Sequence, residues 1–117
     1  MRLKSITGIT YHVRDVEKTA DFYEKLGFII TKRDDVQISV RLNWFWLDFV
    51  KQDRTALNDN GGQFLYISVD GVDAFHKEVV ENGLEAGEAP HDTLADRREF
   101  LVTDPDGYQL VFFEKNR

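Results

Sequence analysis

The sequence predicts an α+β protein made of two tandem copies of one βαβββ unit. Shifting the chain against itself by 56 positions pairs Val13 with Val69 and Gly27 with Gly83. Each copy has the same order of signals: a strand-like run, an acidic turn, an amphipathic helix that stops at a glycine, and three shorter strand-like runs. We therefore expect a half-open, mostly antiparallel, barrel-like sheet with the helices outside it.

The first copy begins with an expected strand over residues 6–13. Asp15 follows it, and because its carboxylate can accept the free N–H groups of a first helical turn, it is the expected N-cap. Gly27 can adopt the left-handed conformation that ends the helix. The buried helical face is expected to consist of Val16, Ala20, Tyr23 and Leu26, with Phe22 on its flank.

The second copy begins with an expected strand over residues 64–69 and turns at residues 70–71. The helix that follows is expected to end at residues 82–83. His76 lies beside its apolar stripe, a position that is more typical of packing than of chemistry. The stripe itself consists of Val72, Phe75 and Val79.

Three shorter strand-like runs follow each helix, and two tight turns separate some of them. One turn is expected at residues 42–43. The other is at residues 104–107, where Pro105 fixes φ and Gly107 permits a positive φ. The expected strands are 28–32, 36–41 and 44–50 in the first copy and 84–88, 98–103 and 108–114 in the second.

A chain of 117 residues is expected to form a single domain, 1–117, because a second core usually requires a longer chain. Module one covers about 1–50 and module two about 63–117. Residues 51–62 between them are polar and end in an Asn-Gly-Gly run, which is typical of a linker.

Composition excludes several classes of function. The net charge of −6 disfavours a nucleic-acid partner, whose phosphates would be repelled, but it is compatible with a cationic small ligand. The absence of cysteine excludes disulfides, thiolate metal sites and a cysteine nucleophile. No apolar run approaches the roughly 18 residues of a membrane span. The first residues are too few and too polar for a secretory signal, so the cytoplasm is the expected location.

Two stretches carry the most specific patterns. Residues 13–28 contain the expected N-cap, helix and terminal glycine, and residues 98–107 end in Asp-Pro-Asp-Gly. Both resemble signatures of the vicinal-oxygen-chelate superfamily, which includes glyoxalase I, extradiol dioxygenases, fosfomycin-resistance enzymes and bleomycin-binding proteins. Together with the repeat, this resemblance covers essentially the whole chain. It implies the glyoxalase/bleomycin-resistance fold.

Within that superfamily the chain looks most like the bleomycin-resistance proteins. Residues 64–73 resemble the strand that opens their second half, which is aromatic where the metalloenzymes usually carry a ligand. The resemblance implies a homodimer whose subunits together enclose two pockets, without a protein-bound metal. It does not imply a particular antibiotic.

The metal-ligand positions of the superfamily can be tested in this sequence. Its metalloenzymes bind a divalent ion through the first and last strands of both units. Only Asp48 offers a metal-binding side chain there, and a catalytic metal needs about three protein ligands. We therefore expect no metal ligands and no cofactor. By resemblance, the four positions correspond to Gly8, Asp48, Phe64 and Val111.

His12 and His91 are the candidates for substitute metal ligands. His12 shares a strand face with Gly8 but lies four residues further along, which would disperse the site. His91 lies in the polar loop 89–97 and is expected to be solvated.

Strand alternation predicts the lining of a cavity around Asp48. Trp44 and Trp46 should point the same way as Asp48, while Phe45, Leu47 and Phe49 pack under the helices. This lining is aromatic, with one carboxylate and a few hydrogen-bonding groups. The expected ligand-binding residues are Thr10, His12, Trp44, Trp46, Asp48, Phe64, Tyr66, Gln109, Val111 and Phe113.

An aromatic wall with one carboxylate favours ligands that are cationic or planar. The sequence thus favours a metal-free protein that sequesters a small cationic or aromatic ligand in a dimer pocket, as an antibiotic-resistance protein would. No catalytic residue is predicted, since no nucleophile elbow, serine–histidine motif or phosphate-binding loop is present.

Three alternatives remain open at this point. The tryptophans could belong to the core or to a dimer interface, with Asp48 paired to Arg41 or Arg97. The chain could be a divalent-metal-dependent lyase, isomerase or dioxygenase with a relocated site. It could also be an interaction domain whose aromatic surface contacts a protein.

Overall fold

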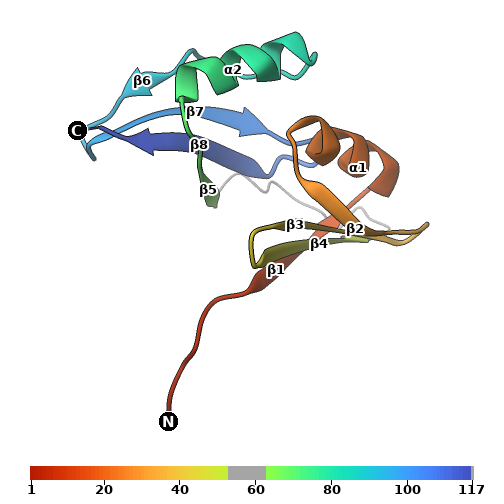
Figure 1. Ribbon diagram of the computed structural model, residues 1–117. Helices are drawn as coiled ribbons and strands as arrows, with labels where there is room; N and C mark the ends of the chain where they lie inside the picture. The colour runs from red at the N-terminus through yellow and green to blue at the C-terminus, as the bar shows by residue number, and fades with distance from the viewer. Residues whose placement is uncertain (53–62, 117) are drawn as a thin grey trace. The chain divides into compact units, whose positions relative to one another are not determined.

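The computed structural model describes residues 1–52 and 63–116. The chain divides into two compact units, Met1–Asn58 (unit 1) and Asp59–Arg117 (unit 2). In each unit one helix lies along one face of a four-stranded sheet (Figure 1). The α+β class and the two βαβββ units are confirmed. Among the described residues the strands are hydrogen-bonded as two sheets of four, one in each unit, and not as one sheet.

Unit 1 contains a mixed sheet in the order β1-β4-β3-β2. The strand pair β1–β4 is parallel, and the other two pairs are antiparallel. Its elements are β1 (Gly8–Val13), α1 (Val16–Lys25), β2 (Ile29–Arg33), β3 (Gln37–Leu42) and β4 (Phe45–Lys51).

Unit 2 repeats this topology in the order β5-β8-β7-β6. The first and last strands, β5 and β8, are again parallel neighbours, and the other two pairs are antiparallel. Its elements are β5 (Phe64–Ser68), α2 (Val72–Glu81), β6 (His91–Asp92), β7 (Arg97–Thr103) and β8 (Gln109–Lys115).

Helix α1 begins and ends as predicted. The Asp15 carboxylate accepts the backbone N–H groups of Glu17 at 3.0 Å and Lys18 at 3.2 Å, which satisfies two donors of the first turn. Gly27 follows the helix with a φ of 101°. The predicted apolar face is buried against the sheet, and it also includes Thr19.

Helix α2 begins in a way that the sequence did not reveal. Gly71 occupies the N-cap with a φ of 72° and offers no side chain. The Glu114 carboxylate on β8 accepts the Val72 N–H at 2.6 Å instead, and its negative charge also suits the positive end of the helix dipole. Phe75 packs on Phe100 and Phe112 beneath the helix, which completes the core of unit 2.

The repeat persists in space but with an insertion. Gly8 and Phe64 begin equivalent strands 56 residues apart, whereas the equivalent residues Trp46 and Gln109 are 63 apart. Unit 2 therefore has seven more residues between its helix and its last strand. Six of them fall in the connection that leads to β7, and one falls in the turn between β7 and β8.

This insertion makes the predicted strand at 84–88 wrong. Between α2 and β7, a segment that the structure describes in full, only His91 and Asp92 pair with β7, and they lie inside the segment predicted as a polar loop. Continuing their register backwards would place residues 84–86 opposite the turn after β7, where there is no strand to pair with. Gly87, with a φ of 55°, also interrupts an extended conformation there.

The other boundaries differ from the predictions by one or two residues. Strand β1 starts at Gly8 rather than at residue 6, and β4 continues through Lys51, the first residue of the predicted linker. Most of that linker, 53–62, lies outside the described residues. Neither helix in the described part of the chain is long and apolar enough to span a membrane.

Asp73 and Arg98 connect α2 to β7. Arg98 donates from Nε to Asp73 Oδ2 at 2.9 Å and from Nη2 to Asp73 Oδ1 at 3.0 Å, a two-point pair. It also reaches Asp92 Oδ1 on β6 at 3.5 Å. The hydrogen bonds from Arg98 lower the pKa of Asp73 below its ordinary value of 3.8.

Asp73→Asn is expected to destabilise the protein at pH 7 and to lose this effect in acid. Because folding depresses the pKa of Asp73, its stabilising contribution is present above the ordinary value of 3.8 and disappears as the pH falls through the folded value. The urea midpoint of the variant should lie below that of the parent at pH 7, and the two should converge below about pH 3. Asp35→Asn, which removes an exposed carboxylate from the β2–β3 turn, is the control. Equal gaps at both pH values would contradict the expectation.

Candidate functional site

In unit 1 the helix-free face of the sheet collects the predicted site residues. The register pairs Thr10 with Asp48 and Gly8 with Trp46, so these side chains project from one face. His12 continues the same face along β1 and is exposed. On the opposite face Phe49 is buried against Tyr23 of α1, with ring centroids 4.5 Å apart. The predicted alternation of β4 is confirmed.

The Trp46 ring lies over Gly8. A Cβ atom added to Gly8 would overlap the six-membered ring of the indole at a separation that real Cβ atoms do not reach. The glycine is therefore needed because of a close approach rather than an unusual φ. Trp46 remains 40 % exposed, so its ring is still available at the surface of the sheet.

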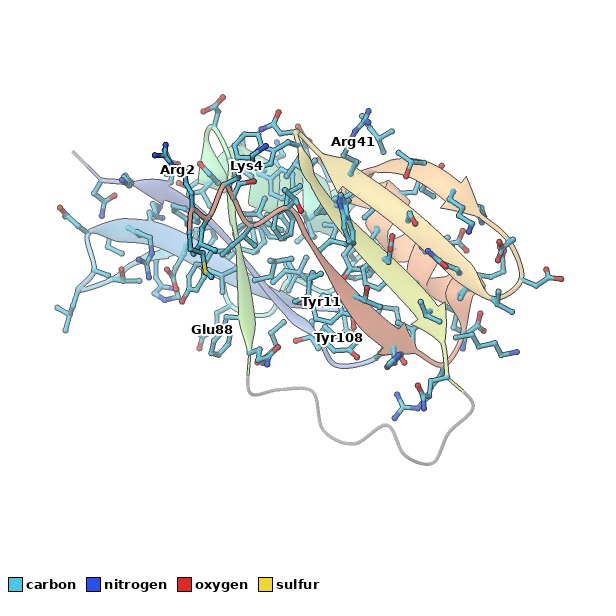
Figure 2. All side chains as sticks on the ribbon, turned by 90° about the horizontal axis from the view of Figure 1, so that it is seen from below. Arg2, Lys4, Tyr11, Arg41, Glu88 and Tyr108 are labelled. Atoms are coloured by element: carbon cyan, nitrogen blue, oxygen red, sulfur yellow. The ribbon has the colours of Figure 1, made fainter. Side chains whose placement is uncertain are left out.

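Asp48 is the centre of a hydrogen-bonded row. Ser39 on β3 donates its hydroxyl to Asp48 Oδ1 at 2.5 Å, and Gln37 Nε2 donates to the Ser39 hydroxyl at 3.2 Å. Within unit 1 the partner of Asp48 is thus a hydroxyl and not Arg41, one of the two arginines considered as an alternative. Arg41 extends from the end of β3, where it is exposed (Figure 2). The Ser39 hydrogen bond fixes one carboxylate oxygen and orients the other.

Trp44 departs from the predicted arrangement. Strand β4 begins at Phe45, and Trp44 is the second residue of the two-residue turn that follows Leu42. Asn43 begins this turn with a φ of 57°, a conformation that asparagine tolerates. The prediction that strand alternation places Trp44 beside Trp46 is therefore wrong. The Trp44 side chain is exposed.

In unit 2 the helix-free face carries three aromatic rings, on β5 and β8. Phe64 pairs with Gln109, and Tyr66 pairs with Val111. Phe113 lies two residues after Val111 on β8 and therefore on the same face. Phe64 is 51 % exposed and Tyr66 48 %, whereas Val111 is buried. The Gln109 Oε1 atom is buried and accepts no hydrogen bond from the described residues.

The two helix-free faces differ in chemistry at equivalent positions. The central row of unit 1 is Thr10, Asp48 and Ser39, which is polar throughout. The equivalent row of unit 2 is Tyr66, Val111 and Leu101. The duplicated fold thus presents a carboxylate-centred surface in one unit and an apolar, aromatic surface in the other, and the structure describes each by itself.

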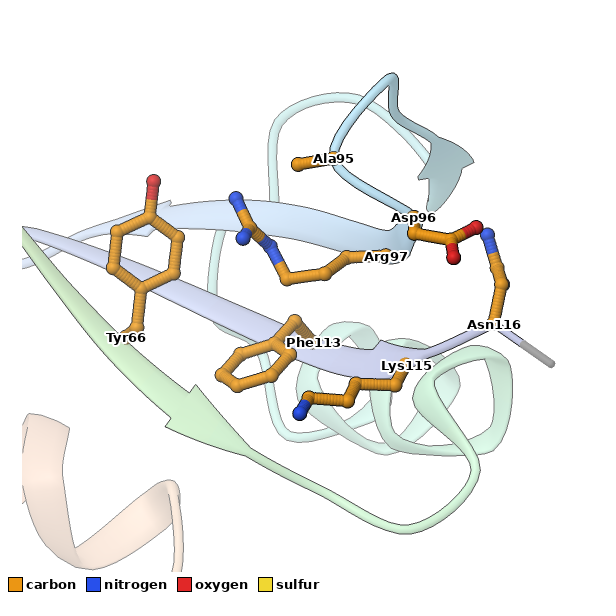
Figure 3. A pocket seen from close by; sticks show the side chains of 7 residues that line it. All are labelled: Tyr66, Ala95, Asp96, Arg97, Phe113, Lys115 and Asn116. Carbon is orange, nitrogen blue, oxygen red and sulfur yellow. The ribbon is translucent and has the colours of Figure 1, made fainter.

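Arg97 is the residue that sequence reasoning missed as part of the site. Its guanidinium carbon lies 5.0 Å from the centroid of the Tyr66 ring and 5.8 Å from that of Phe113, and its Nε donates to Glu99 Oε1 at 3.1 Å. Arg97, Tyr66 and Phe113 border a cavity of about 460 Å³ (Figure 3). It is lined by Tyr66, Ala95, Asp96, Arg97, Phe113, Lys115 and Asn116.

The turn before β7 positions Arg97. The Thr93 hydroxyl donates to the Arg97 carbonyl at 3.0 Å and accepts the Ala95 N–H at 3.2 Å. Asp96 completes the turn with a φ of 65°. Arg97 therefore enters the strand with its side chain on the helix-free face, two residues before Glu99 on the same face.

The residues at the superfamily's metal-ligand positions do not fit a metal ion. Gly8 lies beneath the Trp46 ring, which fills the space that a ligand side chain would need there. Phe64 and Val111 offer no donor atom, and one oxygen of Asp48 is already bonded to Ser39. Within residues 1–52 and 63–116, no three histidine, aspartate or glutamate side chains lie together in a way that could hold a metal ion. His91, one of the two candidate substitute ligands, is exposed and belongs to no such group.

Comparison with known proteins agrees with the observed fold. A family model described as "Glyoxalase/Bleomycin resistance protein/Dioxygenase superfamily" matches residues 5–112. A glyoxalase/bleomycin resistance protein/dioxygenase from Nocardioides is 17 % identical with a TM-score of 0.82, and the match covers 100 % of this chain and 87 % of that one.

Two further solved structures are similar in fold. A bleomycin-binding protein complexed with bleomycin is 23 % identical with a TM-score of 0.73, covering 97 % of this chain and 100 % of that one. A bleomycin resistance determinant encoded on the transposon Tn5 is 21 % identical with a TM-score of 0.76 and the same coverage. Since the family model spans residues 5–112, the chain belongs to the glyoxalase/bleomycin resistance protein/dioxygenase superfamily.

Proposed function

We propose that this protein is a homodimer that sequesters a small cationic or aromatic molecule on its helix-free sheet faces, without a metal ion held by the protein. The observation that supports this most directly is the Trp46 ring over Gly8. By resemblance, relatives that bind a metal carry a ligand side chain at the position of Gly8. Here the exposed Trp46 ring occupies that space and offers a surface for stacking. The proposal therefore replaces coordination by stacking and charge as the means of recognition.

Exposed rings in both units supply the stacking surface. Trp46 in unit 1 and Phe64 and Tyr66 in unit 2 are each 40 % exposed or more, although a sheet face of this kind normally buries its aromatic residues. A planar ligand that covered such rings would remove apolar area from water and gain ring–ring contact.

Asp48 supplies the charge. It stands beside Trp46 on the same face, separated by one residue of β4, and Ser39 holds one of its oxygens. Its other oxygen accepts no hydrogen bond from the described residues, and such a half-buried carboxylate favours a positively charged or hydrogen-bond-donating group. In unit 2 the buried Gln109 Oε1 offers a second acceptor for a ligand donor.

The two solved relatives named above define the first ligands to test, since one binds bleomycin and the other is a bleomycin resistance determinant. Bleomycin and small aromatic cations should be titrated into Trp44→Phe protein, in which Trp46 is the remaining tryptophan. We expect a saturable change in Trp46 emission at one ligand per subunit, and sedimentation equilibrium should give the mass of two chains.

Charge recognition is tested with Asp48→Asn. The variant should bind the cations roughly ten- to a hundredfold more weakly, because a charge-assisted hydrogen bond contributes about 1.5–3 kcal/mol. It should bind a neutral aromatic analogue as the parent does. Asp35→Asn, an exposed carboxylate in a turn, is the matched control and should change neither affinity. Unchanged emission across the panel, or one tightly bound nickel, zinc, manganese or iron ion per subunit, would refute the proposal.

A further inference from the structure

We infer that the Arg97 cavity of unit 2 binds the carboxylate of a small aromatic acid. The inference rests on the proposed function for its premise that the chain binds a small molecule, and it specifies the chemistry of one face. It reverses the charge preference expected for that face from the sequence. Its basis is the position of Arg97, Tyr66 and Phe113 around a cavity of about 460 Å³, a size typical of small-molecule sites.

Arg97 is oriented with one edge engaged and one edge open. Its Nε is bonded to Glu99, and its planar group lies against the Tyr66 and Phe113 rings. Its two terminal nitrogens donate to no residue in the part of the chain that the structure describes. Figure 3 shows this end of Arg97 directed toward Tyr66. A guanidinium held in this way has less freedom to lose when it binds a ligand.

The open edge of the guanidinium matches a carboxylate. Two terminal N–H groups in one plane can donate to both oxygens of a carboxylate, whose geometry is equally planar. Lys115 lines the same cavity and adds a second positive charge. The one acidic side chain in the lining, Asp96, lies beside Asn116 at the end away from Tyr66 (Figure 3).

The same contacts disfavour a cation in this cavity. The faces of Tyr66 and Phe113 that would attract a positive ligand already lie within 5.0 and 5.8 Å of the Arg97 guanidinium. A second cation would be repelled there. The half-exposed Tyr66 ring still offers its remaining surface to the ring of an aromatic acid.

The test compares three probes of similar shape on the full chain labelled with ¹⁵N. Benzoate, benzamide and benzylammonium are each titrated while backbone amide resonances are recorded. We expect benzoate to shift the amides of Tyr66, Arg97 and Asn116 saturably. Benzamide should bind at least tenfold more weakly, and benzylammonium should leave these resonances unchanged.

Variants separate recognition from folding. Arg97→Gln should weaken benzoate binding at least tenfold, and Arg97→Lys, which keeps the charge but not the planar fork, should fall between. The matched control is Arg98→Gln, whose side chain projects from the other face of β7 to Asp73. It should bind benzoate like the parent even though it unfolds at lower urea.

Equal binding of benzoate and benzamide overturns the inference, as does undiminished binding by Arg97→Gln. If Arg97→Gln does not fold, the Lys variant and the probe comparison decide the matter. The two proposals fail separately. If the cations change Trp46 emission but benzoate does not bind, this inference alone is refuted. If benzoate binds but none of the cations changes Trp46 emission, the cationic site of unit 1 is refuted and this inference stands.

Discussion

Asp104→Ala is expected to destabilise the protein by about 2–4 kcal/mol, because it removes the side-chain acceptor of two backbone donors, one buried and one partly buried. The Asp104 side chain is 4 % exposed, and its Oδ1 accepts the N–H groups of Asp106 at 2.8 Å and Tyr108 at 2.9 Å. These bonds shape the turn between β7 and β8, whose strand pair passes beneath α2. Urea unfolding followed by circular dichroism measures the loss.

Two controls separate the hydrogen bonds from other effects of the change. Asp104→Asn retains an acceptor oxygen and should cost under about 1 kcal/mol. Asp34→Ala removes a similar turn in unit 1, where Asp34 accepts from Val36 and Gln37 at 2.9 Å, but that side chain is exposed and water can replace it. It should cost clearly less than Asp104→Ala. Equal losses at Asp34 and Asp104 would show that burial is not the deciding factor.

Gly8→Ala is expected to displace the Trp46 ring and to cost about 1–3 kcal/mol, the usual range for overpacking. The added methyl group occupies the space of the indole, and the outer side of Trp46 is exposed, so the ring can move outward. In the Trp44→Phe background, Trp46 emission should shift to longer wavelength and acrylamide should quench it more strongly. If the proposed function is right, affinity for aromatic cations should fall with it.

A double-mutant cycle tests whether the methyl–indole overlap is the cause. In a Trp46→Ala background the overlap is gone, and Gly8→Ala should be neutral or stabilising by up to about 1 kcal/mol, because alanine restricts the unfolded chain. The coupling between the two positions, which is the difference between these two effects, should therefore be about 1–4 kcal/mol. Additive costs together with an unchanged Trp46 spectrum would show that the ring does not lie over Gly8.

Local signals in the sequence predicted most of the fold. Asp15 and Gly27 mark the two ends of α1 because capping depends on neighbouring residues only. The 56-residue repeat located α2 as well, from Val72 to Glu81. The same repeat gave a false strand at 84–88, since a constant offset cannot register the six residues inserted before β7.

Only the part of the candidate site that follows from side-chain alternation along a single strand could be predicted from the sequence. Trp46 and Asp48 share a face by period-two geometry, and the structure confirms it. Glu99 opposite Phe113 could also have been found by counting back from the turn at 104–107. The approach of Arg97 to Tyr66 could not, because it depends on the parallel register of β5 and β8.

Interactions across strands were beyond sequence reasoning for the same reason. The cap of α2 comes from Glu114, 42 residues away, and no spacing rule connects the two. The requirement for glycine at position 8 arises from an indole that is adjacent only through the pairing of β1 with β4. From the sequence, Gly8 was therefore interpreted as a metal-ligand position without a ligand, and its contact with the Trp46 ring was not predicted.

The parallel pairing of first and last strands also has a mechanical consequence. In each unit the chain enters at the start of one strand and leaves at the end of its parallel neighbour, β1 with β4 and β5 with β8. A pulling force applied to the two ends of a unit acts along these strands in opposite directions. It loads the whole ladder between them at once, in shear, whereas a hairpin pulled from its open end would unzip one rung after another. Each half of the protein should thus resist extension more strongly than its thermodynamic stability alone would suggest.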